Sequence, residues 1–539
     1  MRTHEVFNQA PPLVPFDTSR NPALIEGLHR EGAGWAEPEV RELGVLAGAE
    51  TAQEWGRFAN DYPPVLHTHD RWGNRVDEVE FHPHWHDLMR VAVEHGLHGS
   101  PWLDDRPGAH TARAAKFFTW GAADAGHMCP ISMTYAVIPA LRHNPELAKR
   151  FEPLLGSRTY DFGLREPSTK AGLIAGMSMT EKQGGSDVRA NTTTATPQPD
   201  GSYRIVGHKW FTSAPMSDMF LTLAQSPEGL SCFLLPRVLP DGTRNPIRIQ
   251  RLKDKLGNKS NASSEIEYEN ATGWLVGTPG AGVKTIIEMV NMTRLDCVIG
   301  SATGMRMGAV QAVHHARHRA AFGANLVDQP AMRNVLADLV IESDAATTVM
   351  MRLAGATDRA STDEGEAALR RIALAVTKYW VCKRAPAHAA EALECLGGNG
   401  YAEESGMPRL YREAPLMSIW EGSGNVAALD ALRAMGRQPE TVEAFFAEVT
   451  RARGGDARLD DAIDRLGKEL TDLADIEYRA RRVVELMALV LQGAQLVRHG
   501  HPAVADAFCA TRLGGDHGIA FGTLPVGVNT AAILERAYQ

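Results

Sequence analysis

The chain has 539 residues, a length that fits three or four domains better than one. Hydrophobic residues make up 44% and charged residues 22% of it, which excludes a disordered or fibrous protein. Its 56 Lys and Arg stand against 65 Asp and Glu, a net charge of −9, so the whole chain lacks the positive charge typical of nucleic-acid binders. Six scattered cysteines without a C-x-x-C pair predict a reduced, cytoplasmic protein. We expect no signal peptide and no membrane partner, because no run approaches the roughly 20 apolar residues that a membrane span needs.

The first 175 residues predict helices separated by Pro- and Gly-marked breaks. Apolar residues recur at helical spacing between Leu88 and Leu97, and residues 117–139 form a second apolar stretch. The segment before them is rich in Pro, Gly and aromatic residues, and we expect it to form an arm over a neighbouring surface. We expect no metal at His82, His84 and His86, since no acidic or Cys ligand accompanies them at standard spacing.

From residue 176 to residue 281 the chain is β-prone and punctuated by turns. Residues 192–196, the turn Pro199-Asp200-Gly201 and residues 203–207 predict strand, tight turn and strand. The segment predicts an all-β domain of about 100 residues.

Helical spacing returns at Gly282, with many Ala and Gly residues that allow helices to approach closely in a bundle. A break at residues 436–439 precedes a last helical segment, with an amphipathic helix predicted over 475–498. The fold class predicted is therefore mainly α with a central β domain. Its four domains are expected at residues 1–175, 176–281, 282–437 and 438–539.

Three motifs could carry chemistry, and each also has a plain structural interpretation. Residues 177–187 place paired glycines among hydroxyl side chains, which suits a planar or phosphorylated ligand but also an ordinary polar loop. Residues 209–213 place an indole beside two hydroxyls, which suits a flat aromatic cofactor or an ordinary core Trp at a strand end.

The third motif, residues 418–425, precedes a helix and contains Glu421 beside Trp420 and Gly422. A carboxylate next to an indole in a closed pocket has a raised pKa, the condition that a general base near neutral pH requires. A Glu in a surface loop is the alternative.

The order of these motifs, with residues 319–323 and 396–401 between them, resembles the acyl-CoA dehydrogenases over roughly residues 80–435. Residues 4–9, 129–135 and 408–413 look like the branch of that family that responds to DNA alkylation. The appended segment fits that branch, so this resemblance spans the whole chain. The resemblance implies a helical N-terminal domain, a β-barrel-like middle domain, a helical bundle and an appended helical C-terminal domain.

The resemblance implies that FAD lies between the β domain and the following helices. It assigns FAD contacts to Met177, Met179, Thr180, Gly185, Ser186, Trp210, Phe211, Gly397, Gly398, Trp420, Ser423 and Asn425, and to Thr212 or Ser213 at the polar edge of the flavin. Arg319, Phe322 and Gln329 match positions that reach the FAD of a neighbouring subunit, which implies a homotetramer built as a dimer of dimers.

Glu421 matches the base that removes the α-proton of an acyl-CoA, and Arg294 matches a substrate contact. Some relatives place their base where this chain has Thr293, which leaves Glu421 as the candidate. Glu394 stands where a carboxylate would repel the FAD phosphates unless it turns away, and Trp420 would narrow the acyl channel. The resemblance therefore implies weak or specialised activity.

The resemblance also implies double-stranded DNA as a partner in the response to alkylation damage. Residues 440–539 hold 11 Lys and Arg against 15 Asp and Glu, so binding requires a local cluster of cations. A solvated helix face with internal ion pairs explains the same charges. An ordinary catabolic acyl-CoA dehydrogenase without a DNA function is the alternative. The candidate contacts are Arg433, Arg437, Arg479, Arg481, Arg482 and Arg512.

Overall fold

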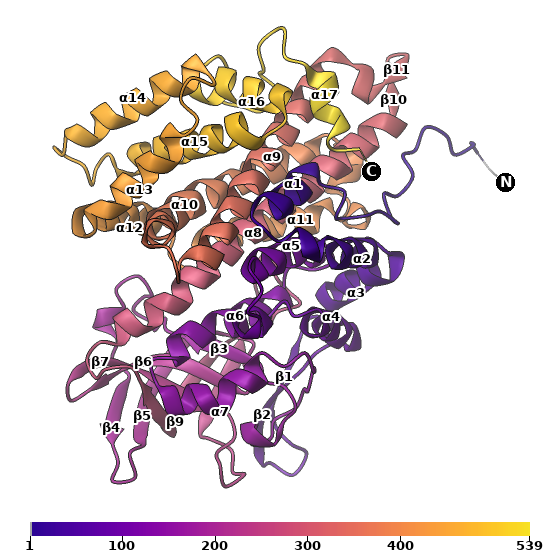
Figure 1. Ribbon diagram of the computed structural model, residues 1–539. Helices are drawn as coiled ribbons and strands as arrows, with labels where there is room; N and C mark the ends of the chain where they lie inside the picture. The colour runs from indigo at the N-terminus through magenta and orange to yellow at the C-terminus, as the bar shows by residue number, and fades with distance from the viewer. Residues whose placement is uncertain (1–2, 539) are drawn as a thin grey trace. The chain divides into compact units, whose positions relative to one another are not determined.

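The computed structural model describes residues 3–538 and divides into two compact units (Figure 1). The barrel unit comprises Thr51–Ala109 and Ala123–Thr293, and the helical unit comprises Met1–Glu50, His110–Ala122 and Arg294–Gln539. The first 175 residues are therefore shared between the two units. The division into four domains stays a prediction.

The barrel unit is built on a seven-stranded sheet with the strand order β3-β6-β4-β5-β9-β7, in which β8 pairs with β9. Because β6 also pairs with β7, the path from β6 through β4, β5, β9 and β7 closes on itself as a barrel. The strands are β3 (Ala175–Ser178), β4 (Thr194–Pro197), β5 (Tyr203–Ser213), β6 (Met219–Ser226), β7 (Gly229–Pro236), β8 (Ile247–Leu252) and β9 (Ser263–Val276).

Burial matches the apolar sequence of strands β6 and β7 and of helix α6. Residues 219–224 of β6 and 230–236 of β7 are buried on both faces, as expected for continuous apolar runs. Helix α6 is buried at every residue except Pro139, which matches its almost wholly apolar sequence. The helices of this unit are α4 (Pro83–Glu94), α6 (Met128–Leu141) and α7 (Pro145–Leu155).

A hairpin in the N-terminal segment was not predicted from the sequence. Strand β1 (Val65–His69) pairs with β2 (Arg75–Glu80), and the Asp70 carboxylate between them accepts the backbone N–H groups of Trp72 and Asn74, each at 2.9 Å. The strands are five and six residues long and rich in charged and His residues. Only the Asp70 turn could have indicated them.

The helical unit packs long helices around buried Ala, Val, Leu and Met side chains, and the bundle expected after residue 282 is present. Three further helices, α3 (Glu50–Asp61), α5 (Ala109–Gly121) and α8 (Gly282–His318), contribute residues to both units. The unit contains α1 (Pro22–Arg30), α2 (Glu37–Ala47), α9 (Pro330–Arg359), α10 (Glu364–Glu394), α11 (Met407–Ile419), α12 (Gly424–Arg437), α13 (Pro439–Thr450), α14 (Ala457–Thr471), α15 (Ala480–His499), α16 (Pro502–Phe508) and α17 (Thr530–Glu535), with the short hairpin β10 (Ala320–Ala321) and β11 (Ala324–Asn325).

The N-terminal arm lies beside this hairpin. The Asn8 side-chain amide donates to the Ala320 carbonyl and accepts from the Ala320 backbone N–H, each at 2.8 Å. The Arg319 guanidinium donates to the Asn8 carbonyl. Residues 3–21, which hold neither helix nor strand, therefore cover a neighbouring surface of their own unit. The rest of the segment that was predicted as an arm instead folds into α1, α2, α3 and the β1–β2 hairpin.

The predicted helix over 475–498 is shorter at its start than the sequence suggested. Asp475 has a left-handed backbone (φ 51°), and α15 begins only at Ala480, with Arg479 as its N-cap residue. Residues 475–479 therefore form a turn, and the side chain of Arg479 lies at the helix end rather than on its face.

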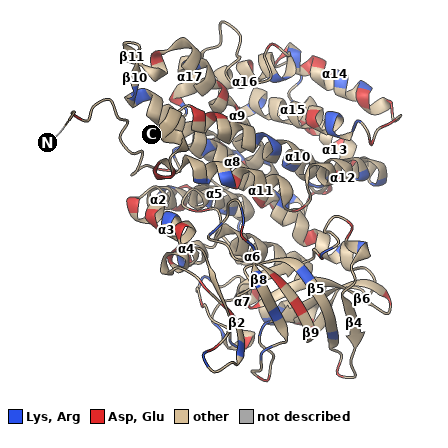
Figure 2. Cartoon of the chain, turned by 180° about the vertical axis from the view of Figure 1, so that it is seen from behind, with Lys and Arg blue, Asp and Glu red and all other residues tan. Residues whose placement is uncertain are grey.

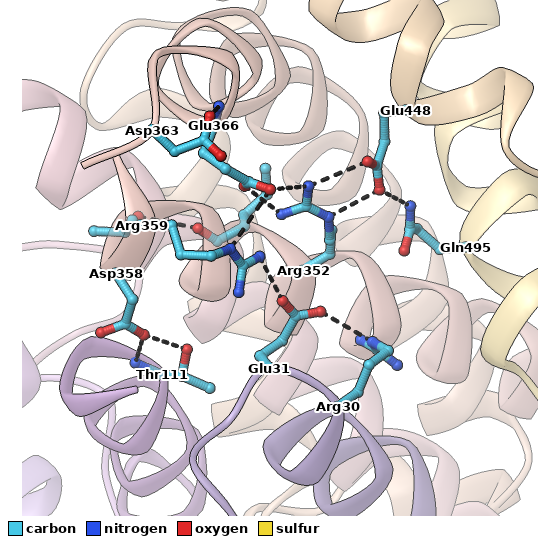
Figure 3. A network of polar contacts seen from close by, with 12 residues as sticks. Arg30, Glu31, Thr111, Arg352, Asp358, Arg359, Asp363, Glu366, Glu448 and Gln495 are labelled. Atoms are coloured by element: carbon cyan, nitrogen blue, oxygen red, sulfur yellow. Dashed lines mark hydrogen bonds and ion pairs between the residues drawn. The ribbon is translucent and has the colours of Figure 1, made fainter. Parts of the chain in front are cut away.

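A buried polar network joins α13 and α15 to the bundle (Figure 3). Arg352 on α9 binds Glu448 on α13 through Nε at 2.8 Å and Nη2 at 3.1 Å. The same guanidinium binds Glu366 on α10 through two bonds of 2.8 and 2.9 Å. Gln495 on α15 donates to Glu448 at 2.7 Å, so one arginine and one glutamate connect four helices.

Among residues 3–538, none of the helices combines the length and the apolar composition of a membrane span. Within the same range, His, Cys, Asp and Glu side chains nowhere form a group of three suited to a metal ion. His84 instead contacts Asp87 at 3.0 Å, and His86 contacts the Tyr160 hydroxyl at 2.8 Å. All six cysteines are buried thiols.

Candidate functional site

In the barrel unit, the loop after β3 is held by a carboxylate that lies fully inside the protein. Glu181 accepts the Lys209 ammonium at 2.9 Å and the backbone N–H groups of Thr192 and Thr193 at 2.7 and 3.1 Å. Burial would raise the pKa of Glu181, but these bonds and one from Gln183 outweigh it and hold the pKa well below its ordinary value. Burial lowers the pKa of Lys209 to about 8.

The Glu181 contacts hold one part of the loop after β3, and the rest of that loop is available for a ligand. Ser186 and Gly185 are exposed, and Met179 and Thr180 are half-buried. A Cβ on Gly185 would lie 2.3 Å from the Thr180 hydroxyl, so the loop requires glycine there. These four predicted FAD contacts therefore lie in one loop, whose backbone is accessible at Gly185.

A β-bulge on β5 decides where the side chains of the second motif point. Lys209 pairs with Ile266 and Thr212 pairs with Ser264, so Trp210 and Phe211 together face a single residue of β9. The extra residue allows Lys209 and Thr212 both to be buried, while Phe211 is 50% exposed and Trp210 is half-buried. The sequence did not predict this bulge.

The bulge also gives different surroundings to Thr212 and Ser213, the two candidate hydroxyls for the polar edge of the flavin. Thr212 is buried and shares a hydrogen bond with the Ser178 hydroxyl of β3. Ser213 is half-buried and shares one of 3.2 Å with Ser263. Thr212 is thus tied to the strand that leads into the loop of Met179 and Thr180.

Three cations surround the indole of Trp210, which the sequence did not indicate. The Lys253 ammonium lies 3.4 Å from the ring centroid, and Lys182 and Arg251 lie at 5.7 and 5.8 Å. Glu265 accepts from Lys253 at 2.6 Å and from Arg251 at 2.7 Å. These contacts fix the ring by cation–π attraction and fix the cations by ion pairs.

In the helical unit, Glu421 lies in a strained turn between α11 and α12. Its backbone is left-handed (φ 57°), a conformation that costs a non-glycine residue about 1–2 kcal/mol, and Gly422 follows with φ 99°. Arg294 donates from Nε to the Glu421 carbonyl at 3.0 Å. The turn is therefore held by specific contacts against its own strain.

Arg294 was predicted to contact substrate, and the structure gives its guanidinium a different role. Besides Glu421, it binds the Asp430 carboxylate from Nη1 at 2.6 Å, and only 5% of its side chain is exposed. Asp430 also accepts from Arg371 at 3.0 Å. Burial would raise the pKa of Asp430, but these two arginines hold it below its ordinary value. Arg294 thus supports the Glu421 turn.

The remaining predicted FAD contacts of the helical unit are spread over several elements. Nothing lies within 4 Å of where a Cβ would stand on Gly397 or Gly398, so their backbone is open. Phe322, at the tip of the β10–β11 hairpin, is fully exposed, and Gln329 supports the hairpin by donating to the Ala321 carbonyl at 3.0 Å. Trp420 is half-buried, and Ser423 and Asn425 begin α12 as exposed residues.

The predicted DNA contacts differ in their exposure and in their partners. The prediction is wrong for Arg512, whose side chain is 8% exposed and binds Asp338 and Glu342. Arg479 is also unsuited, because its guanidinium binds Glu469 at 2.8 Å and the carbonyls of residues 472 and 474.

Three candidates remain on the surface. The side chains of Arg482 and Arg433 are 77% and 56% exposed, and Arg437 is exposed. Arg481 is exposed but donates to the Asn425 side chain at 2.7 Å. Helix α14 carries acidic residues between its basic ones (Figure 2), so the cations do not form a continuous stripe on that helix.

Three family models match the chain. The AidB N-terminal domain, described as an adaptive response protein, matches residues 8–162, and the acyl-CoA dehydrogenase middle and C-terminal domains match residues 176–271 and 280–436. AidB of Escherichia coli (strain K12) is 45% identical over 521 residues, which cover 95% of this chain and 95% of that protein. Acyl-CoA dehydrogenase family member 11 of Caenorhabditis elegans is 30% identical over 92% of this chain and 85% of its own length.

A solved structure agrees with these matches. The crystal structure of Caenorhabditis elegans ACDH-11 in complex with C11-CoA has a TM-score of 0.85, with 27% identity over 95% of this chain and 92% of that chain. Members of the family are FAD flavoproteins. The chain therefore belongs to the acyl-CoA dehydrogenase family of FAD-containing oxidoreductases, and within it to the proteins similar to AidB.

Proposed function

We propose that the protein dehydrogenates an acyl-CoA thioester with Glu421 as the general base. The observation that carries the proposal is the strained, anchored turn at Glu421, in a chain of this family. The Glu421 carboxylate takes the α-proton of the thioester. Bound FAD would supply the hydride acceptor for the β-hydrogen, so that the acyl group would become an enoyl group.

The donor set of the barrel unit fits such a cofactor. The exposed Ser186 hydroxyl and open glycine backbone suit phosphate oxygens, and the Trp210 indole on the bulge suits the face of an isoalloxazine ring. Thr180 supplies one hydroxyl for its polar edge, and either Thr212 or Ser213 supplies a second. We assign the remaining contacts to the residues predicted above, including Gly397 and Gly398, whose backbone is open, and Glu394 is exposed.

The substrate we propose is an acyl-CoA, in line with the C11-CoA of the Caenorhabditis elegans relative. Trp420 is half-buried and directly precedes Glu421, and we expect its indole to narrow the space beside the base. We therefore expect a restricted set of acyl groups or slow turnover. Turnover of roughly 1–1000 per second on a common acyl-CoA would instead favour an ordinary catabolic dehydrogenase.

The experiment is anaerobic bleaching of the flavin in the purified yellow protein by a panel of acyl-CoA thioesters. Glu421→Gln should abolish bleaching, because an amide cannot accept the proton, while Glu443→Gln, at an exposed glutamate on α13, serves as a matched control that leaves bleaching intact. Unchanged bleaching in Glu421→Gln would refute the role of Glu421.

A second function, binding of double-stranded DNA in the response to alkylation, is favoured by the match to the adaptive-response domain over residues 8–162. Arg433, Arg437 and Arg482 are the exposed cations that we assign to it. We also propose a homotetramer, because the Phe322 hairpin is exposed. In such a tetramer, these three arginines of all four subunits would contribute to binding one duplex. Sedimentation should give a tetramer, and gel shifts should weaken steeply with salt. Salt-independent binding, or none, would contradict the DNA function.

A further inference from the structure

A buried lysine lies underneath the Glu421 turn. Lys378 on α10 is 1% exposed, and its ammonium donates to the Gly422 carbonyl and, at 3.5 Å, to the Ser418 carbonyl. An ammonium is costly to bury unless its N–H groups find acceptors. Here the acceptors are backbone carbonyls at both ends of the turn.

The turn is thus fixed by two cations from two helices. Arg294 on α8 donates to the Glu421 carbonyl at 3.0 Å. Lys378 donates to the carbonyls of Ser418 and Gly422, which precede and follow Glu421 in the chain. Glu421 is left-handed (φ 57°), a state that a non-glycine residue keeps only when its surroundings determine it. The direction of the Glu421 side chain therefore depends on these carbonyl contacts.

We propose that Lys378 is a positioning residue that holds the backbone of residues 418–422 so that the Glu421 carboxylate keeps its reactive orientation. The proposal rests on Glu421 being the base. Lys378 binds the turn through the Ser418 and Gly422 carbonyls, so its removal should change the orientation of the base more than the affinity for substrate. A misplacement of about 1 Å lowers rates roughly 100-fold.

The test compares Lys378→Met with Lys468→Met, a matched removal of an exposed lysine on α14. Each FAD-containing variant is mixed anaerobically with the acyl-CoA that bleaches the native protein fastest. Both the limiting rate of bleaching and the half-saturating acyl-CoA concentration are measured. We expect Lys378→Met to lower the limiting rate about 100-fold, with half-saturation within about threefold of the native value, and Lys468→Met to change neither.

A limiting rate in Lys378→Met within tenfold of the native rate would overturn the proposal. If Lys378→Met does not fold, Lys378→Gln, which keeps two N–H donors but is shorter and neutral, decides by the same tenfold criterion. Glu421→Gln, measured alongside, separates the two claims. Normal bleaching there refutes Glu421 as the base, whereas an inactive Glu421→Gln beside a fast Lys378→Met refutes only the role of Lys378.

Discussion

Glu448 binds Arg352 in the network of Figure 3, and replacement of this carboxylate by Gln is the sharpest test of how the C-terminal helices are held. The side chain is 2% exposed and accepts from Arg352 at 2.8 and 3.1 Å and from Gln495 at 2.7 Å. Arg451 lies 3.1 Å away. The substitution Glu448→Gln keeps the shape of the side chain but removes its charge, so Arg352 would lose one of its two counter-ions.

The magnitude follows from the pKa of Glu448. Burial would raise this pKa, but the bond and charge of Arg352, with Gln495 and Arg451, lower it from 4.5 to about 2. A group whose pKa is depressed on folding stabilises the folded state above its unfolded pKa. This contribution, ~3 kcal/mol at pH 7, is lost as the pH falls from about 4.5 to about 2.

The assay is native-state hydrogen exchange of α13 and α15 together with urea unfolding, at pH 7 and at pH 3. Glu448→Gln should destabilise these helices by ~3 kcal/mol at pH 7, and by much less at pH 3, because pH 3 lies between the two pKa values and part of the contribution of the charge is already lost there. Glu443→Gln, an exposed glutamate on the same helix, is the control. A loss below about 1 kcal/mol at pH 7, or a loss that does not shrink in acid, would refute the reasoning.

Three further predictions follow from the contacts described. Gly422→Ala should lower the melting temperature and slow flavin bleaching, because φ 99° strains any residue with a Cβ. Arg512→Met should destabilise the fold by ~3 kcal/mol yet leave the salt dependence of DNA binding unchanged, whereas Arg482→Ala should reduce that salt slope by about 1 without changing stability. Lys209→Met should leave the Glu181 carboxylate buried without its counter-ion, and the purified protein should lose FAD and yellow colour; full FAD content would contradict the anchoring role.

Local sequence patterns were sufficient to predict most of the helices and strands. The strand-turn-strand pattern of residues 192–207 predicted β4 and β5, small residues at helical spacing predicted the bundle, and the fold class agrees with the family match. The hairpin β1–β2 was missed because its strands are short and polar. The start of α15 was predicted too early, at residue 475, because the apolar residues at helical spacing extend back that far. Asp475 has a left-handed backbone, so the helix does not include it.

For the candidate site, the motifs indicated candidate residues, which stay predictions, but they did not indicate what each side chain contacts. Glu421 was identified by its motif, yet Lys378, buried within an ordinary helical pattern, gave no signal. Arg294 and Arg512 were assigned to ligands, and each is instead bound to carboxylates of its own unit. The sequence does not show whether an arginine faces solvent or binds a buried carboxylate.

The sequence by itself determined the order of helices and strands, the family and the chemistry of the motifs, because these depend on residue type and spacing along the chain. The tertiary structure alone decided the bulge that separates Trp210 from Thr212, the left-handed turn at Glu421 and the pairing of the buried arginines. Each of these depends on groups that are distant in sequence, and their electrostatic and hydrogen-bond energies exist only once folding has brought them together and excluded water.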